Sequence, residues 1–556
     1  MRRALPTLLL LGLVVPPSGA RAATSVSSVA QDRWIEVRTT HLRLVSNASE
    51  GRVRPIAELL EAFRSFLSTS TKGLDLSSGA VDTVVVFKDD ASFDPFKFAA
   101  DAEGSQLMGF FSASPEANWI ALNATPKQNI DNARLFRSFK SPYEIVLHEY
   151  THAIVNRSFP GLPTWLNEGM AVYFGATWID GKSAMVGRPT IEVLSALNGG
   201  LPVTLDRLAA VSSFHGLDAP SVTPAYGAAW ATVHYMLVGS SERGKQFRKY
   251  LGDLASGASA GAPFAVAFGA TPTALDTEVR AYVAKNHYAY LKYPLDALNV
   301  SVPVEAAPLT EEAMRVLLAE LLVDTKRTGR VQVGELIAPV LAKDPAHPGA
   351  LGVRGLIEER ADKPADAERT YRAALSRTAD DPVLRFRLGR VLVTREPVEA
   401  DKLVAPPIAS SPRLAEARTL LEGTLLDRPD LRGAYAYLGL TYLGEPLDHE
   451  RGKVLLREAM KKQPDPHEPL ALPLGAMCLW DGDRAAALEL LKAPASDDLR
   501  WLILERDRLE LNRLGENGGA DVQKAWLRAR IEATGDATVA DQLRTWQTEL
   551  EPTQAP

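Results

Sequence analysis

Cysteine is almost absent from this 556-residue chain, because Cys478 is the only one. A single cysteine cannot form an intramolecular disulfide, so the fold has to be stabilised by its hydrophobic core. Cys478 lies in an apolar stretch with helical spacing, and we interpret it as a small buried hydrophobe rather than a nucleophile. The length and the 46% of hydrophobic residues indicate a globular protein with more than one domain.

The chain also lacks an excess of positive charge and long apolar runs. Its formal net charge of −6 argues against a general nucleic-acid-binding protein, which would usually be basic. Beyond the N-terminal segment, no apolar run is long enough to cross a bilayer. We therefore expect no nucleic-acid partner, and no stable membrane span once the N-terminal segment is removed.

The N-terminal segment has the pattern of a secretory signal peptide. Arg2 and Arg3 form a basic start, residues 8–15 form an apolar run, and residues 20–22 form an A-x-A cleavage site. An uncleaved membrane anchor is the alternative, but the apolar run is short for an anchor and no stop-transfer pattern flanks it. We predict a signal peptide at residues 1–22 and an exported protein, either periplasmic or extracellular.

Histidine is scarce, yet two histidines stand in one H-E-x-x-H motif made of His148, Glu149 and His152. Positions i and i+4 share a helix face, so both imidazoles can reach one ion. Glu168 follows in the next helical segment and supplies a carboxylate. Two imidazoles and one carboxylate, with a fourth position left to water, are typical of a catalytic zinc site. Glu149 then lies beside the metal, where a general base takes a proton from water.

The local sequence favours two consecutive helices around the motif. Apolar residues at helical spacing surround the histidines, residues 160–163 (PGLP) end that helix, and a second helix is predicted at 165–174. Glu168 can then fold back onto the first helix. The alternative interpretation is a pair of surface histidines with solvated carboxylates. A further alternative is another metal, because this ligand set also accepts cobalt or manganese.

These residues carry a resemblance to a known family. HEYTHAIVNR followed by LPTWLNEGMAVYF resembles the gluzincin metallopeptidases, and most of all the peptidase MA-like group. Matched residue by residue, the resemblance implies that His148, His152 and Glu168 bind Zn²⁺ and that Glu149 activates water. It extends more weakly over residues 32–295, for which we predict an α+β zincin-like metallopeptidase domain.

The resemblance also suggests how a peptide or protein substrate is held. Strands are predicted within residues 34–46, at 84–87 and at 119–122, with 109–111 as a hairpin partner and a helix at 53–67. Gluzincins bind extended substrate along an edge strand beside the metal, by backbone pairing. By that resemblance, the strand at 117–122 is the candidate.

Tyr226 is the candidate for a second catalytic residue. It stands near the start of a helix predicted at 225–237, where peptidase MA-like chains often carry a tyrosine. A phenol aimed at the tetrahedral oxyanion would stabilise it by a few kcal/mol. The alternative is that Tyr226 is a core aromatic residue. His234 and Tyr235 stand behind it, and His215 lies in a predicted loop that could line the site.

The C-terminal half changes to helical spacing throughout. We predict a linker at 296–308, a helical repeat domain at 309–510 and a C-terminal part at 511–556, in which a loop at 515–520 precedes the last helix. Recurring proline-containing dipeptides and small residues resemble tetratricopeptide repeats. The predicted fold is thus a zincin-like domain followed by an all-α tetratricopeptide-like solenoid. Such a stack can hold a protein partner, or it can simply shield the first domain.

Together these patterns predict an exported zinc-dependent peptidase, which hydrolyses peptide bonds with metal-activated water and a glutamate base. The alternative is a non-catalytic scaffold that binds peptide or protein through the helical repeats. The presence of the base and of all three metal ligands favours the enzyme.

Overall fold

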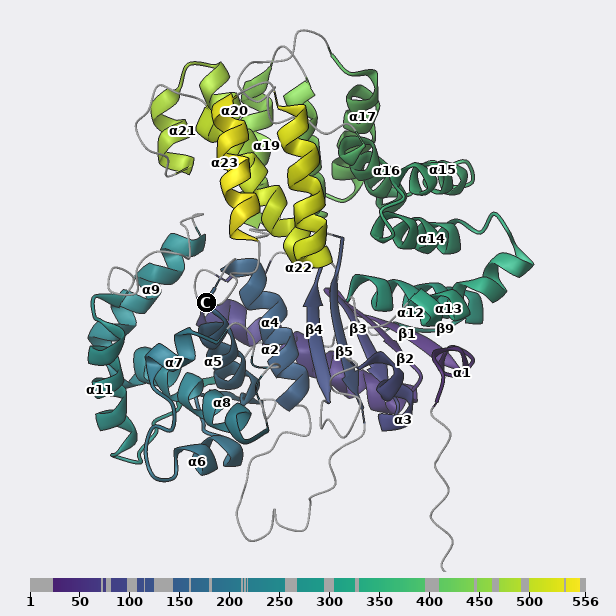
Figure 1. The fold of residues 1–556 in the computed structure, drawn as a ribbon. Helices are drawn as coiled ribbons and strands as arrows, with labels where there is room; N and C mark the ends of the chain where they lie inside the picture. The colour runs from purple at the N-terminus through teal and green to yellow at the C-terminus, as the bar shows by residue number, and fades with distance from the viewer. Residues whose placement is uncertain are drawn as a thin grey trace, which may run out of the picture.

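The chain combines a mixed α/β region with a long helical region (Figure 1). The computed structural model describes residues 24–71, 74–76, 82–97, 108–114, 116–124, 144–159, 162–179, 183–211, 214, 217, 219–255, 268–294, 305–325, 330–395, 410–444, 448–462, 470–491, 500–534 and 537–550. The predicted signal peptide at 1–22 lies outside these residues. No helix in the described part of the chain is both long and apolar enough to span a membrane.

A six-stranded mixed sheet is formed within the described residues, in the order β4-β5-β3-β2-β1-β9. Strands β2, β3 and β5 run parallel to one another, and the other neighbours are antiparallel. The bounds are β1 Trp34–Arg38, β2 Leu42–Ser46, β3 Asp82–Phe87, β4 Gly109–Ala113, β5 Asn118–Asn123 and β9 Glu305–Leu309. The strands predicted within 34–46, at 84–87, 109–111 and 119–122 are therefore confirmed.

The edge of this sheet differs from the prediction. Residues 117–122, proposed as the edge strand, fall mostly in β5, which lies between β3 and β4. Strand β4 is the terminal strand instead, because the hairpin folds it onto the outer side of β5. Sequence alone shows that two strands form a hairpin, but not which of them pairs with the rest of the sheet.

Both faces of the sheet are buried, since its strands send alternate apolar side chains to opposite sides. In β3, Val84 and Val86 join one hydrophobic cluster, whereas Val85 and Phe87 join another. The first cluster includes α2 Glu50–Ser70, α4 Glu144–Ser158, α5 Thr164–Gly175 and α8 Ala219–His234. The second includes α1 Val26–Ala30, α12 Glu311–Asp324, α13 Arg330–Lys343 and α14 Pro348–Arg360.

The predicted boundary between the two regions needs correction. The linker predicted at 296–308 ends in β9, which pairs with β1 from Trp34↔Leu309 to Arg38↔Glu305. Residues 296–304 lie outside the described part of the chain. Helices α12 to α14 then cover the second face of the sheet. The helical region therefore begins as a layer of the sheet domain rather than as a separate core.

Further helices and a small sheet pack around α5 and α8. The small sheet has the order β6-β7-β8 among the described strands. The elements are β6 Trp178–Ile179, β7 Ser183–Val186, α6 Ile191–Leu197, α7 Leu205–Ala209, a π-helix at Tyr235–Gly239, α9 Ser241–Ala255, α11 Pro272–Val283 and β8 Leu291–Pro294. The short α3 Asp90–Phe93 and η1 Asp94–Phe96 follow β3.

The helices from α12 to α21, called the helical array below, pack so that each contacts the next along the chain. After α14 they are α15 Pro364–Leu375, α16 Pro382–Thr394, α17 Pro412–Asp427, α18 Arg432–Thr441, α19 His449–Lys462, α20 Ala471–Trp480 and α21 Arg484–Leu491. A glycine on one helix faces a large residue on the next: Gly389 faces Leu421, and Gly439 faces Leu456. A Cβ at Gly389 or Gly439 would lie 2.8 Å from the facing leucine, so glycine permits this close packing.

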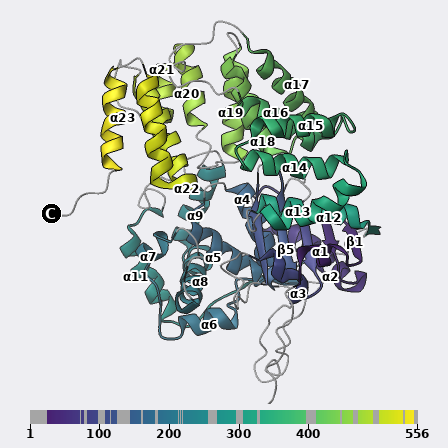
Figure 2. The same cartoon turned by 45° about the vertical axis from the view of Figure 1, so that its right-hand side comes forward.

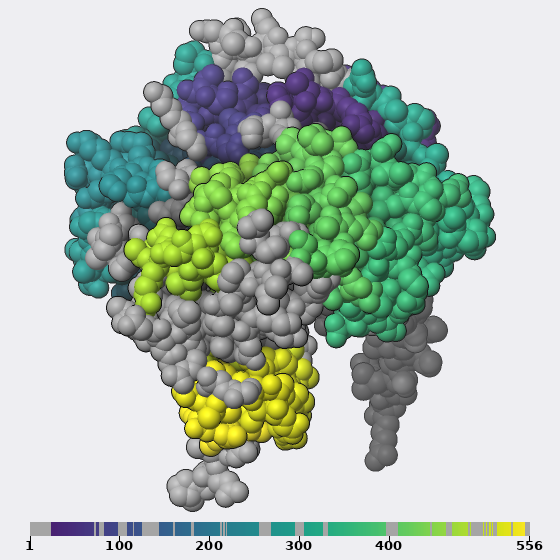
Figure 3. Space-filling view, turned by 90° about the horizontal axis from the view of Figure 1, so that it is seen from above, coloured from purple at the N-terminus to yellow at the C-terminus, as the bar shows by residue number. Residues whose placement is uncertain are grey.

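The last helices differ from the prediction. Residues 515–520, predicted as a loop, belong to α22 Arg500–Ala533, which is followed by α23 Ala537–Glu549. Figures 1 and 2 show that the array rises from the side of the sheet and curves back, with α22 and α23 following its last helices. Seen from above, the green surface of the array adjoins the purple surface of the N-terminal part (Figure 3).

Candidate metal centre

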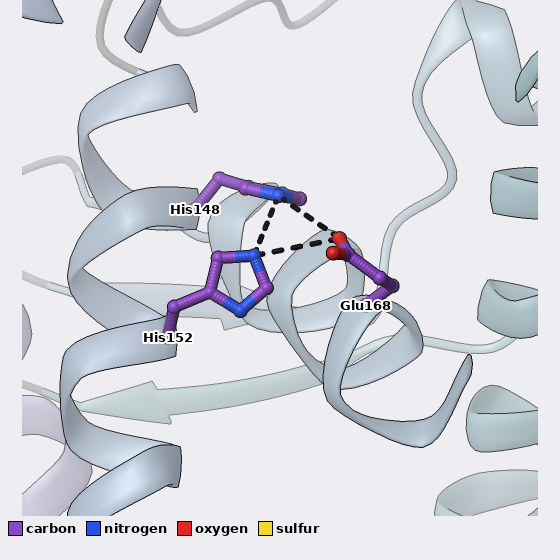
Figure 4. Close-up of side chains that lie close together, drawn as sticks. All are labelled: His148, His152 and Glu168. Atoms are coloured by element: carbon purple, nitrogen blue, oxygen red, sulfur yellow. Dashed lines mark hydrogen bonds and ion pairs between the residues drawn. The ribbon is translucent and has the colours of Figure 1, made fainter. Parts of the chain in front are cut away.

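The three predicted ligands meet between two neighbouring helices. His148 and His152 extend from α4 toward Glu168 on α5 (Figure 4). The two Nε2 atoms lie 3.1 Å apart, and Oε2 of Glu168 lies 3.6 Å from Nε2 of His148 and 3.4 Å from Nε2 of His152. The prediction that these side chains converge is therefore confirmed.

The spacing of the three donor atoms fits a tetrahedral zinc ion. Zinc binds imidazole nitrogen and carboxylate oxygen at about 2.0–2.2 Å, which places neighbouring ligands about 3.3 Å apart in a tetrahedron. The three observed separations of 3.1–3.6 Å bracket this value. Oε2 of Glu168 is buried and has no hydrogen-bond partner among the described residues. An orphaned carboxylate oxygen facing two imidazoles is the arrangement that a cation would satisfy.

Two glycines on α5 allow its close contacts with the flanking helices. A Cβ on Gly175 would lie 3.0 Å from Cα of His148, and a Cβ on Gly169 would lie 2.7 Å from the backbone oxygen of Ala229 on α8. Any larger residue would push α5 away from α4 or from α8. Gly169 directly follows Glu168, so the packing of α5 against α8 also fixes the direction of the carboxylate ligand.

Glu168 is held in its anionic form by the two imidazoles beside it. Burial alone would raise the pKa of Glu168, but the neighbouring imidazoles of His148 and His152 hold this pKa well below its usual value. Burial alone would lower the pKa of His152, but the neighbouring carboxylate of Glu168 raises it to about 9. Glu168 is thus ionised, as a metal-binding carboxylate has to be.

Asn167 is part of the site and was not predicted from the sequence. Its Oδ1 lies 3.0 Å from Nδ1 of His152. In the neutral form of His152 that binds a metal, Nδ1–H donates to this oxygen and the other ring nitrogen, Nε2, presents its lone pair toward Glu168 and His148. Such a partner orients a metal-binding histidine and fixes its tautomer. The sequence does place Asn167 directly before the predicted ligand Glu168, and this adjacency is the feature that could have identified it.

The predicted base, Glu149, is buried where α4 meets β4. Only 7% of its surface is exposed, and its Cγ lies 3.4 Å from the position a Cβ on Gly109 would occupy. Its negative charge helps to raise the pKa of His152. The ring of Phe111 stacks on that of His152, with centroids 6.4 Å apart. Strand β4 therefore borders the site on the side of the predicted base.

Tyr226, on α8, lies beside the predicted ligands. Its ring centroid is 6.1 Å from that of His148 and 5.0 Å from that of Phe214. Burial raises the pKa of the Tyr226 hydroxyl well above its usual value, and the charges of Glu168 and Glu149 act in the same direction. The hydroxyl thus stays protonated and can donate a hydrogen bond.

The other residues suggested around Tyr226 lie elsewhere. His234 is buried, with Nε2 2.9 Å from the carbonyl oxygen of Ala289 and Nδ1 accepting from the Tyr282 hydroxyl at 2.8 Å. The Tyr235 hydroxyl donates to Glu278 at 2.9 Å. Both side chains are therefore engaged in structural contacts away from the metal ligands. His215 lies outside the described residues.

Comparisons with known proteins add little. No protein-family model matches the chain, and no curated protein does. One similar solved structure, described as "MamA RS-1 ArsTM double mutant", is 18% identical with a TM-score of 0.25, covering 36% of this chain and 96% of its own. Another, "Crystal structure of MamA protein", is 17% identical with a TM-score of 0.24, covering 35% and 93%. These likenesses are too weak to support an inference about function.

Proposed function

We propose that this protein is a zinc-dependent peptidase of the gluzincin type. The observation that carries the proposal is the convergence of His148, His152 and Glu168 at separations that suit a tetrahedral ion. Glu149, next to the first histidine on α4, adds a carboxylate that is not part of the ligand group. Three ligands and a separate base are the components of a metal-dependent hydrolase.

In this mechanism the bound zinc ion would polarise the scissile carbonyl and lower the pKa of water. The carboxylate of Glu149 takes a proton from the attacking water and passes it to the leaving amine. Tyr226 donates its hydroxyl proton in a hydrogen bond to the oxygen that becomes negative. Asn167 keeps His152 in the tautomer and orientation that metal binding needs.

The proposed substrate is a peptide or protein segment in extended form. Strand β4 is the terminal strand of the sheet and borders α4 at Glu149, so it is the candidate for backbone pairing with substrate. It replaces the strand at 117–122 in this role. The sequence of residues 1–22 supports export, to the periplasm or the cell exterior.

We further propose that the helical array is a tetratricopeptide-like solenoid. Its paired helices, packed through a glycine on one helix and a large side chain on the next, support this assignment. Helices stacked in this way can bind a partner protein, and a scaffold that acts through the array alone is the alternative function. The two functions differ in whether the metal site catalyses the cleavage of peptides.

The central test replaces the proposed base without touching the ligands. Purified mature protein is loaded with zinc, its metal content is measured, and cleavage of an unbiased peptide library is followed with and without a chelator. Glu149→Gln is expected to retain about one zinc per chain and to lose cleavage by several orders of magnitude. Glu58→Gln, which alters an exposed glutamate on α2, is the matched control and should behave like the parent.

Two results would contradict the proposal. Full activity in Glu149→Gln would exclude the glutamate base. Stoichiometric zinc in the parent protein, with no cleavage of any peptide, would favour the binding scaffold.

A further inference from the structure

The turn between β4 and β5 is held in shape by its own first residue. The backbone N–H of Ser114 donates to the carbonyl of Ala117 at 2.8 Å, which closes the turn. Oγ of Ser114 accepts from the backbone N–H groups of Glu116 and Ala117 at 3.2 and 3.0 Å. The N–H groups of Glu116 and Ala117 are thereby held within the turn itself.

The side chain of Glu116 is buried against two arginines of α16. Its Oε2 lies 2.7 Å from Nη2 of Arg387, and its Oε1 lies 2.8 Å from Nη1 of Arg390. The side chain of Glu116 is 5% exposed, and those of the arginines are 4% and 12% exposed. Both carboxylate oxygens are therefore used by residues that lie more than 250 positions along the chain.

Two neighbours of Glu116 in β5 reach other helices of the array. Nε1 of Trp119 donates to Asp324 of α12 at 2.9 Å, and Arg432 of α18 donates to the side-chain oxygen of Asn118 at 2.6 Å. The hairpin thus contacts three helices of the array, α12, α16 and α18. We call Asp324, Arg387, Arg390 and Arg432 the receiving face.

Each arginine of the receiving face that pairs with Glu116 also has a second carboxylate partner. Arg390 also pairs with Glu359 at 2.8 Å, and Arg387 also pairs with Glu320 at 3.1 Å, so each arginine is shared between two carboxylates. Burial alone would raise the pKa of Glu116, but the charges of Arg387 and Arg390 hold it below its usual value. Removing the charge of Glu116 takes from each arginine one of its two carboxylate partners inside a desolvated contact, which is unfavourable.

The other end of the same strand lies at the metal centre. Gly109, at the start of β4, packs against Ile145 and Glu149, and Phe111 stacks on His152. A strand of this length spans about 14–17 Å, so β4 directly connects the receiving face with the site. A shift of the turn would displace the backbone edge proposed to pair with substrate, whereas Glu149 and the predicted ligands are carried by α4 and α5.

We propose that Glu116 is a positioning residue that fastens the β4–β5 hairpin to the helical array and so fixes the edge strand of the metal site. This rests on the proposed peptidase function for its effect on substrate, but the docking itself does not. The array then acts first as an intramolecular receptor for the hairpin. Its receiving face is occupied, so an external partner has to use another part of the array.

Amide hydrogen exchange measured by mass spectrometry on the full chain tests this without requiring activity. In Glu116→Gln, exchange in residues 108–114 is expected to rise by about tenfold or more, with zinc content unchanged, because the hairpin loses its charged anchor. Arg432→Ala, which removes the contact to Asn118 and leaves the pairs of Glu116 with Arg387 and Arg390 intact, should give a smaller rise in the same segment. Glu422→Gln, which breaks an exposed ion pair with Arg451, is the control and should change nothing there.

Peptide kinetics separate positioning from a general structural role. Positioning predicts that KM rises more than kcat falls, because the edge that pairs with substrate becomes mobile while the ligands and base stay in place. Unchanged exchange in 108–114 for both Glu116→Gln and Arg432→Ala would overturn the docking proposal. Faster exchange spread evenly over all strands, with KM unaltered, would overturn the positioning role. If the parent protein cleaves no peptide, the exchange result still decides the docking.

Discussion

Asn167 and His152 are joined across the gap between α5 and α4, with 3.0 Å between Oδ1 and Nδ1. The neighbouring residue, Glu168, faces the opposite nitrogen of the same imidazole at 3.4 Å. Two consecutive residues of α5 therefore hold both ends of one histidine ring. These two consecutive residues therefore act on the same side chain: Asn167 orients a predicted metal ligand, and Glu168 is itself a predicted ligand.

Replacing Asn167 should weaken metal binding without removing a ligand. Asn167→Ala is expected to lower zinc affinity by about 10–100-fold, the usual cost of losing a partner that orients a metal-binding histidine. Asn167→Asp keeps an acceptor for Nδ1–H and should lose less. Competition with a chromophoric chelator at constant pH measures both. Equal zinc affinity in the parent and in Asn167→Ala would show that His152 is oriented by its own packing.

Tyr226 offers a test that separates catalysis from packing. Tyr226→Phe keeps the ring against Phe214 and His148 and removes only the hydroxyl. If the hydroxyl stabilises the oxyanion, kcat falls by about 10²–10³-fold while the zinc content stays the same. A core aromatic role predicts nearly full activity in this variant. Peptide cleavage at saturating substrate, with metal analysis of the same sample, distinguishes the two roles.

The convergence of the three predicted ligands could be foreseen because their geometry is local. His148 and His152 are one helical turn apart, so helix geometry alone brings them together. The position of Glu168 could be predicted once the next helix was expected to fold back, because residues 160–163 end the first helix and turn the chain. Asn167 was missed because its role depends on how α5 is rotated against α4, and packing at Gly169 and Gly175 determines that rotation.

The long-range pairings could not be predicted, for a physical reason. Strand β9 joins β1 across more than 260 residues, and nothing in the local pattern of 305–309 identifies its partner. The glycines at 515–519 locally favour a break, yet α22 continues through them. Leu511 and Leu527, on either side, share one hydrophobic cluster with Val539 of α23. Tertiary packing there outweighs the low helix propensity of glycine.

Gly169→Ala should destabilise the fold and disturb the site together. The added methyl would lie 2.7 Å from both the backbone oxygen of Ala229 and Cγ2 of Val233, and the backbone cannot turn aside as a flexible side chain would. Overpacking of this kind costs about 1–3 kcal/mol. Gly252→Ala on α9, where nothing lies within 4 Å of the new Cβ, is the control and should be neutral or slightly stabilising.

Denaturant unfolding and zinc titration of the two glycine variants measure these effects. Gly169→Ala should lose both stability and zinc affinity, because Glu168 is carried on the displaced turn of α5. If Gly169→Ala unfolds at the same denaturant concentration as Gly252→Ala, α5 and α8 can move apart without a loss of folding stability.

His234 gives the stability of the fold a specific dependence on pH. Burial lowers the pKa of His234 to about 4, whereas an unfolded histidine titrates near 6.5. The folded protein therefore binds this proton less readily than the unfolded chain. The contribution is fully present above pH 6.5 and is lost as the pH falls from 6.5 to about 4, by about 3 kcal/mol in total.

The comparison variant for this prediction is His234→Asn, which cannot titrate in that range. It should be less stable than the parent at pH 7, since it loses the aromatic contacts of His234 with Trp230 and Tyr282. The stability difference between the two proteins, from urea unfolding, should shrink by about 3 kcal/mol between pH 7 and pH 4. All other titrating groups are common to both proteins and cancel. A difference that stays constant over this range would mean that protonated His234 is accommodated in the fold, with the Tyr282 hydroxyl turning to accept its Nδ1–H.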